Sequence, residues 1–425
     1  MLPAYKRLRG RGGRAGWYQA EHEAVATEQE VTISFSVKEQ GGDEIRRVAT
    51  EVSDPTSPKY GQYLTQRQID EIVAPKSEDV QAVTSWLAAN GVGYQRKGVS
   101  TIEARTSVGK AGELLQTNFH VARHDADNYA VVQAGDYVLP SAIHNAVAAV
   151  FGLHGLPIPR NILAPPGMPA NVTPAVIYST YGVDFKEASR SDKNTQAVAE
   201  FQGQFMNSTD LATMFAQEVS QIDANYKVGT DDVVSKWVGK HVENSGGIEA
   251  ELDIQFIMGV SPGIKTEFWE FPGQDFCGDL HMWTGNLTSG DDCPLVHSVS
   301  YGWQGNLTQI QCKDENVDAV DGNFAKLAAK GISIMISSGD SGSGYSPNNA
   351  CGMNPGQKGV GIDGTIARAI EAQEVGQCCE EASQMNAKGW TFVPHQKPDT
   401  VEAEADPGAF SFKDTVALIR SPGMK

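Results

Sequence analysis

Residues 247–253 read GIEAELD, and residues 337–344 read SSGDSGSG. The first stretch predicts a helix, because apolar residues recur through it at helical spacing. Glu249 and Asp253 are four residues apart, so their carboxylates lie nearly one above the other on one helix face. Like charges in that arrangement repel, which destabilises the helix unless the pair has a use. The second stretch follows an apolar run, which predicts a buried strand that leads into a turn containing Asp340.

In their order and separation, these two stretches resemble motifs of the sedolisins, the serine-carboxyl peptidases. In that family a Glu and an Asp from such a helix form a triad with a serine, and an Asp from an SSGD turn lines the oxyanion hole. The resemblance implies Glu249 as general base, Asp253 as its orienting partner and Asp340 as oxyanion stabiliser. The alternative interpretation is a solvated helix face and an ordinary turn.

Carboxylates suit this chemistry in acid. A serine hydroxyl needs a base to accept its proton as it attacks an amide. Histidine titrates near about 6.5 and is already protonated in acid, whereas a carboxylate titrates near about 4 and can still accept. An Asp in an oxyanion hole must be protonated to donate a hydrogen bond, which also requires acid or a raised pKa. A Glu/Asp/Asp set therefore predicts a peptidase that works in acid.

The first part of the chain predicts a small α+β domain, because short strands alternate with helices and no long parallel pattern is present. Strands are expected at 31–37, 101–106 and 129–132, and helices at 45–52, 80–90 and 111–117. Three pieces resemble the sedolisin activation prodomain, which implies a ferredoxin-like fold and an intramolecular inhibitor: SPKYGQYLT (57–65), VGKAGELLQTNFHVARH (108–124) and VFGLHGLP (150–157).

After residue 173 the pattern changes to alternating strands and helices, which predicts an α/β domain with a mainly parallel sheet and helices on both faces. We expect strands within 194–205 and at 233–238, 266–271, 296–301 and 331–337, and helices at 208–220 and 318–329. The resemblance implies a subtilisin-like sheet. The segment HSVSYGW (297–303) resembles the sedolisin substrate-binding strand, which implies Ser300, Tyr301 and Gly302 as substrate-binding residues and a peptide or protein as substrate.

These expectations give four regions. Residues 1–28 form a basic tail without the apolar core of a signal peptide. Residues 29–157 form the prodomain, and 158–172 form a Pro-rich linker in which the family is processed. Residues 173–425 form the catalytic domain, whose resemblance to the family ends at about residue 350.

The nucleophile of the family lies in a motif of SGTSxS type, and the 425 residues contain none. The family's calcium site also lies beyond the matching region, so calcium is expected only for a complete member, and no cofactor or metal is expected for this chain. We therefore expect a truncated catalytic domain. The alternative is an inactive remnant that binds peptides or a partner. Five serines are poor nucleophile candidates, because none lies in the expected context: Ser341, Ser343, Ser383, Ser411 and Ser421.

A second peptidase class is suggested by GDSG at 339–342, which in trypsin-type enzymes contains the nucleophile. That interpretation would make Ser341 the nucleophile and would need a histidine base and an all-β fold. Here the usual GDSGGP is GDSGSG, no histidine has the AAHC context, and the pattern is α/β.

Composition limits the partners and the cellular location. With 40% hydrophobic and 20% charged residues, the chain is typical of globular proteins, and its net charge of −18 argues against binding nucleic acid or an anionic membrane. An even, clustered set of cysteines predicts a disulfide framework whose pairing stays open: Cys277, Cys293, Cys312, Cys351, Cys378 and Cys379. A loop closed by Cys277 and Cys293 would contribute about 3 kcal/mol. With sequons at Asn171, Asn207, Asn286 and Asn306, the cysteines favour a lysosomal or extracellular protein.

Overall fold

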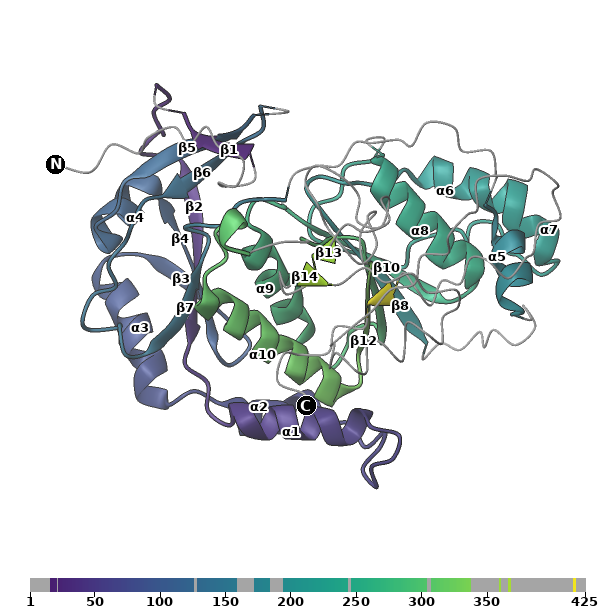
Figure 1. Ribbon diagram of the computed structural model, residues 1–425, viewed down its shortest axis with the longest axis horizontal. Helices are drawn as coiled ribbons and strands as arrows, with labels where there is room; N and C mark the ends of the chain where they lie inside the picture. The colour runs from purple at the N-terminus through teal and green to yellow at the C-terminus, as the bar shows by residue number, and fades with distance from the viewer. Residues whose placement is uncertain are drawn as a thin grey trace.

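The computed structural model describes most of the first 337 residues and three short strands after them (Figure 1). The described ranges are 16–20, 22–125, 128–158, 172–183, 194–243, 246–303 and 307–337, with β13 (Gly359–Val360), β14 (Ile366–Ala367) and β15 (Val416–Ala417). The expected linker lies almost wholly outside these ranges, as does the end of the SSGDSGSG stretch.

The N-terminal half contains a four-stranded antiparallel sheet in the order β3-β4-β2-β7. Its strands are β2 (Glu30–Val37), β3 (Gly93–Lys97), β4 (Thr101–Ser107) and β7 (Val147–Phe151). Helices α3 (Ser77–Ala89) and α4 (Val108–Leu115) pack against it. The alternation of VTISFSV places Ile33, Phe35 and Val37 in the core, as a half-buried strand requires. The predicted strands and helices of this region are confirmed.

A second, three-stranded antiparallel sheet lies beside the first, in the order β1-β5-β6. It consists of β1 (Trp17–Gln19), β5 (Phe119–His124) and β6 (Ala130–Ala134). Trp17 is buried and contacts the rings of His124 and Tyr129. Strand β1 lies within the region expected to be a basic tail, so ordered structure begins earlier than the sequence predicted.

The C-terminal half is built on a parallel sheet in the order β12-β11-β8-β10-β9, with the short β15 antiparallel at one edge. Its parallel strands are β8 (Thr195–Phe201), β9 (Lys236–Val238), β10 (Lys265–Phe271), β11 (Val296–Val299) and β12 (Ser333–Ser337). The predicted α/β class is confirmed, and an all-β fold of the trypsin type is contradicted.

Helices cover both faces of this sheet, because residues that alternate along its strands face opposite cores. Val198 and Phe268 pack against α6 (Ser208–Met214), the π-helical turn η3 (Phe215–Val219) and α8 (Ile248–Val260). Ala199 and Trp269 point to the other face, toward α9 (Phe276–Leu287) and α10 (Asp314–Lys330). The shorter helices α5 (Pro174–Tyr181) and α7 (Ser220–Ile222) lie on the α8 side, and the 3-10 turn η4 (Leu307–Ile310) lies on the side of α9 and α10.

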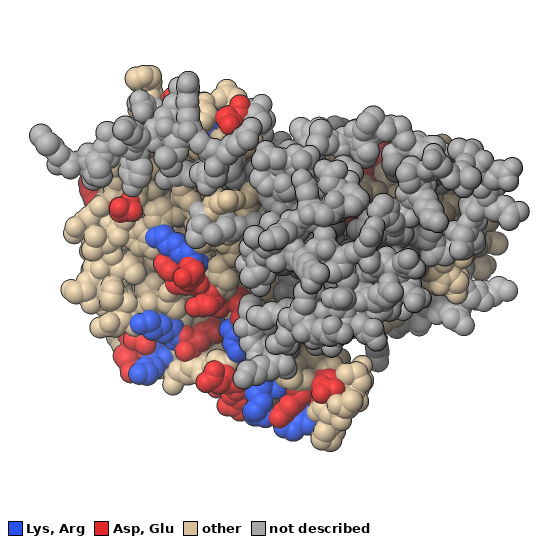
Figure 2. Space-filling view, viewed as in Figure 1, with Lys and Arg blue, Asp and Glu red and all other residues tan. Residues whose placement is uncertain are grey.

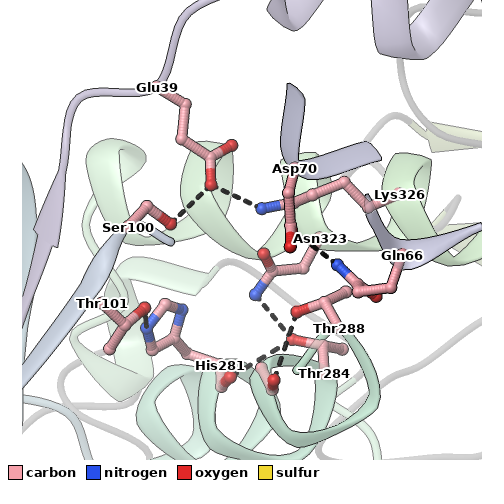
Figure 3. Close-up of polar contacts among 11 residues, drawn as sticks. Glu39, Gln66, Asp70, Ser100, Thr101, His281, Thr284, Thr288, Asn323 and Lys326 are labelled. Carbon is pink, nitrogen blue, oxygen red and sulfur yellow. Dashed lines mark hydrogen bonds and ion pairs between the residues drawn. The ribbon is translucent and has the colours of Figure 1, made fainter. Parts of the chain in front are cut away.

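The two halves share an extensive interface centred on α10. Helices α1 (Gly42–Ser53) and α2 (Gln66–Val73) pack along it, and β7 lies close to its start (Figure 1). Lys326, in the middle of α10, is buried and bonds Glu39 of the N-terminal half at 2.6 Å (Figure 3). Ser100 Oγ donates to the same Glu39 oxygen at 2.5 Å. A buried charge is thus paired and hydrogen-bonded across the interface, as burial requires.

The surface of the N-terminal half mixes both signs of charge. On the face shown in Figure 2, basic and acidic side chains are interspersed, and Glu51 bonds both Arg47 and Lys59. Among the described residues, every helix is too short or too polar to span a bilayer.

The disulfide in the described part of the chain joins Cys277 to Cys312, and Cys293 is a free thiol. The loop suggested for Cys277 and Cys293 is therefore wrong. Residues 276–287 form helix α9, which at about 1.5 Å per residue carries the chain about 15 Å from Cys277 before Cys293 is reached. The sequence analysis did not predict this helix.

Candidate active site

Helix α8 begins at the end of the parallel sheet where β8 terminates. After β8, Phe205 forms a parallel bridge with Gly246, and Gly247 N donates to Phe205 O at 2.7 Å. A Cβ at Gly247 would lie 2.0 Å from the side-chain oxygen of Gln204. The small residue therefore allows the helix to start in close contact with the strand end, at the carboxyl edge where α/β proteins gather functional groups.

The predicted helix with Glu249 and Asp253 is confirmed, and the structure brings Asp253 together with two other residues. Ser300 Oγ, just after β11, donates to Asp253 Oδ1 at 3.1 Å. Asp253 Oδ2 and Glu200 Oε1 are both buried, and neither has a donor among the described residues. Glu200 is the penultimate residue of β8 and is 2% exposed. Asp253, Glu200 and Ser300 thus form a cluster at the carboxyl edge of the sheet.

The electrostatics of this cluster favour one shared proton. The pKa of Asp253 is raised to about 6, mainly by burial and further by the nearby Glu249 charge, while the Ser300 hydrogen bond opposes the rise. Burial also raises the pKa of Glu200 well above its usual range, with further contributions from the charges of Asp253 and Glu249. Neighbouring buried carboxyls cannot all ionise, so in mild acid at least one of them is neutral.

A third carboxylate on α8 has a structural role instead. Glu251 Oε1 accepts from Asn207 N at 2.6 Å, and Glu251 Oε2 accepts from Gln255 at 2.8 Å. The first bond ties α8 to the start of α6, and the second lies within α8. The side chains of Ile248 and Leu252, which helped to predict the helix, are largely exposed, so the apolar pattern marked the helix but not its buried face.

The other expected substrate-binding residues lie next to the cluster in different settings. Tyr301 is buried, with its ring stacked on Phe201 at 4.1 Å and tilted against Phe276 at 5.2 Å. Burial, followed by the charge of Asp279, raises the pKa of Tyr301 well above its usual range. Gly302 is exposed, and a Cβ there would meet no atom within 4 Å. The backbone at Gly302 is therefore accessible, whereas the Tyr301 side chain belongs to the core.

Two expectations fall outside the described residues. Asp340 lies three residues beyond the end of β12, and the serines from Ser341 onward also lie outside. Within the part of the chain that the structure describes, no group of three or more His, Cys, Asp or Glu side chains is arranged to bind a metal ion.

Glu200 is the site residue that the sequence analysis missed. The sequence does contain a signal for Glu200, because this acidic residue interrupts the apolar run near the carboxyl end of the strand TQAVAEF. A buried parallel strand reads as a nearly continuous apolar run, and a carboxylate inside it needs a reason.

Comparison with known proteins supports the same interpretation. Residues 16–156 match the family described as "Pro-kumamolisin, activation domain". The chain is 30% identical to tripeptidyl-peptidase 1 of Rattus norvegicus over 343 residues, which covers 75% of this chain and 58% of that protein. It is 29% identical to tripeptidyl-peptidase 1 of Canis lupus familiaris over 343 residues, and 29% identical to that of Homo sapiens over 332 residues. These cover 75% of this chain in both cases, and 58% and 57% of the relatives. The chain thus spans 58% of the length of the first of these relatives, and these matches together support a protein of the sedolisin family.

Proposed function

We propose that the chain is the zymogen form of an acid-acting serine-carboxyl peptidase and contains its prodomain and the base-bearing part of its catalytic domain. The observation that supports this best is the carboxyl cluster. Glu249 and Asp253 share a helix at the carboxyl edge of a parallel sheet, and Asp253 is held by Ser300 beside the buried Glu200. Buried, interacting carboxyls of this kind are typical of catalytic sites.

In the proposed reaction, Glu249 accepts the proton of a serine hydroxyl as that oxygen attacks a peptide carbonyl. Asp253 orients Glu249, and Asp340 donates a hydrogen bond to the oxyanion. Glu200 shares a proton with Asp253, which limits the negative charge of the cluster when Glu249 is ionised. The serine itself belongs to a motif that these 425 residues do not contain.

The domain assignment is part of the same proposal. The strand order β3-β4-β2-β7, with α3 and α4 in its connections, supports a ferredoxin-like prodomain at 29–157, and the prodomain acts as an intramolecular inhibitor. The parallel sheet supports a subtilisin-like catalytic domain after 173. We assign no calcium ligands, because the described residues offer no suitable cluster. We propose a tripeptidyl-peptidase or an endopeptidase, lysosomal or extracellular, with peptides as substrates.

An assay of the chain tests this proposal. The purified 425-residue chain should not hydrolyse a fluorogenic tripeptide substrate between about pH 3 and 6, because loss of a triad nucleophile lowers the rate by many orders of magnitude. Turnover that persists when serine-directed inhibitors are added would contradict both the assigned residue roles and the prediction that the chain is inactive without its nucleophile.

The second candidate function is a peptide-binding protein without catalysis, and the missing SGTSxS motif favours it. Sequencing the transcript downstream of codon 425 separates the two. An in-frame SGTSxS motif supports the peptidase. A stop codon that directly follows codon 425 in every transcript supports the binding protein.

A further inference from the structure

A short segment of the N-terminal half, residues 152–156, is bound by two separate stretches of the C-terminal half. Leu156 N donates to Ile310 O at 2.9 Å, and Leu156 O accepts from Phe276 N at 3.3 Å. The Leu156 side chain is completely buried, in a core cluster that includes residues of both halves. Leu156 is therefore inserted between 275–277 and 310–312, with both of its backbone polar groups satisfied there.

The fit around this segment is specific for glycine. Asp275 caps α9 by accepting from Gly278 N at 3.0 Å, and its other oxygen accepts from Gly152 N at 3.4 Å. Gly155 has φ +83°, and a Cβ there would lie 1.9 Å from Asp275 Oδ1. A carboxylate in such close contact with the backbone excludes any larger residue at 155.

The disulfide joins the two stretches that hold Leu156. Cys277 follows Phe276 directly, and Cys312 is two residues beyond Ile310. The two cysteines have Cα atoms 5.8 Å apart and are 4% and 3% exposed. The bond therefore fixes the separation of the stretches, and with it the width of the gap that Leu156 occupies.

We propose that a docking site for the prodomain is formed by two stretches, residues 275–277 and 310–312, which the Cys277–Cys312 disulfide joins. The 152–156 segment of the prodomain occupies this site. Without the disulfide, the two stretches would have to be ordered each time the segment binds, and that ordering opposes docking. With it, the site keeps its shape when the segment leaves. This role rests on the proposed prodomain assignment, but it concerns the association of the two halves and does not depend on the proposed catalysis.

Hydrogen–deuterium exchange on the full chain tests the docking site directly. In the double variant Cys277→Ala/Cys312→Ala at neutral pH, the amides of Leu156 and Phe276 should exchange about tenfold faster or more, because local opening becomes easier. Exchange in β2 and β8, the central strands of the two main sheets, should stay unchanged. The matched control is Cys293→Ala, which removes a thiol outside the disulfide and should leave Leu156 and Phe276 as they are.

Two outcomes would overturn the proposal. Unchanged exchange at Leu156 and Phe276 in the double variant would show that the disulfide does not shape the site. Equal acceleration in β2 and β8 would show that it stabilises the whole fold instead. If the double variant does not fold, Leu156→Ala tests the docking site with the disulfide intact. This variant should accelerate hydrogen exchange at the Phe276 amide. An unchanged exchange rate at Phe276 would show that Leu156 does not anchor the segment.

Discussion

Replacing His281 with phenylalanine should make the folded protein less sensitive to acid. His281 lies on α9 at the interface of the two halves and is 4% exposed. Its ring stacks on Phe151 of β7 with centroids 4.0 Å apart, and its Nε2 lies 3.4 Å from Thr101 Oγ1 (Figure 3). Burial, followed by the nearby charge of Lys326, which is paired with Glu39, lowers the pKa of His281 to about 3.

The size of the effect follows from proton linkage. An unfolded histidine titrates near about 6.5. Between that value and the folded pKa of about 3, the unfolded state binds a proton that the folded state does not. Stability is therefore lost as the pH falls through this window, by about 1.4 kcal/mol per pH unit. Between pH 7 and 4.5 the loss due to His281 is about 2.5 kcal/mol. Phenylalanine does not titrate, so the variant should not show this loss of stability.

Urea denaturation from pH 7 to about 4.5, followed by tryptophan fluorescence, measures this difference. The larger phenylalanine ring adds a strain that is constant with pH, so the quantity of interest is the change in the wild-type–variant difference. This comparison also cancels the contributions of two other buried groups to the pH dependence of stability. The pKa of His297 is lowered to about 3, so it acts in the same direction as His281. The pKa of Asp275 is raised to about 6, so its contribution has the opposite sign. The exposed His144→Phe serves as the control. Parallel pH curves for wild type and His281→Phe would refute the reasoning.

Four further predictions concern the interface and the site. Lys326→Met should destabilise the chain by about 2 to 3 kcal/mol in urea melts, because it leaves Glu39 without its cation, and adding Glu39→Gln should restore much of the loss. Gly155→Ala should destabilise by at least about 1 to 2 kcal/mol, since its φ of +83° disfavours a side chain and the Cβ overlaps a carboxylate, and a normal melting temperature would contradict this. In a version extended to include an SGTSxS motif, Asp340→Ala should lower kcat about a hundredfold to a thousandfold, whereas Asp340→Asn should lose less activity and remain active to higher pH. In the same version, Glu249→Gln should remove most activity without changing the circular dichroism. Equal loss in both Asp340 variants, or near-normal rates in Glu249→Gln, would disprove the assigned roles.

Local sequence patterns predicted many of the helices and strands and the fold class, although they missed β1 and α9. Alternation in VTISFSV predicted β2, and helical spacing in GIEAELD predicted α8, because both periods are local properties of the backbone. The same local geometry placed Glu249 and Asp253 on one face before any tertiary contact was known. Strands that alternate with helices then predicted the parallel sheet, since parallel neighbours need crossover connections.

Which distant residues meet depends on the tertiary fold. Glu200 lies beside Asp253, and Ser300 bonds that carboxyl, because β8 and β11 are neighbours in the sheet and both end at the start of α8. Cys277 pairs with Cys312 because helix α9 leads the chain away from Cys277 before it reaches Cys293. Such contacts depend on strand order and on the path between elements, which no local period of the sequence encodes.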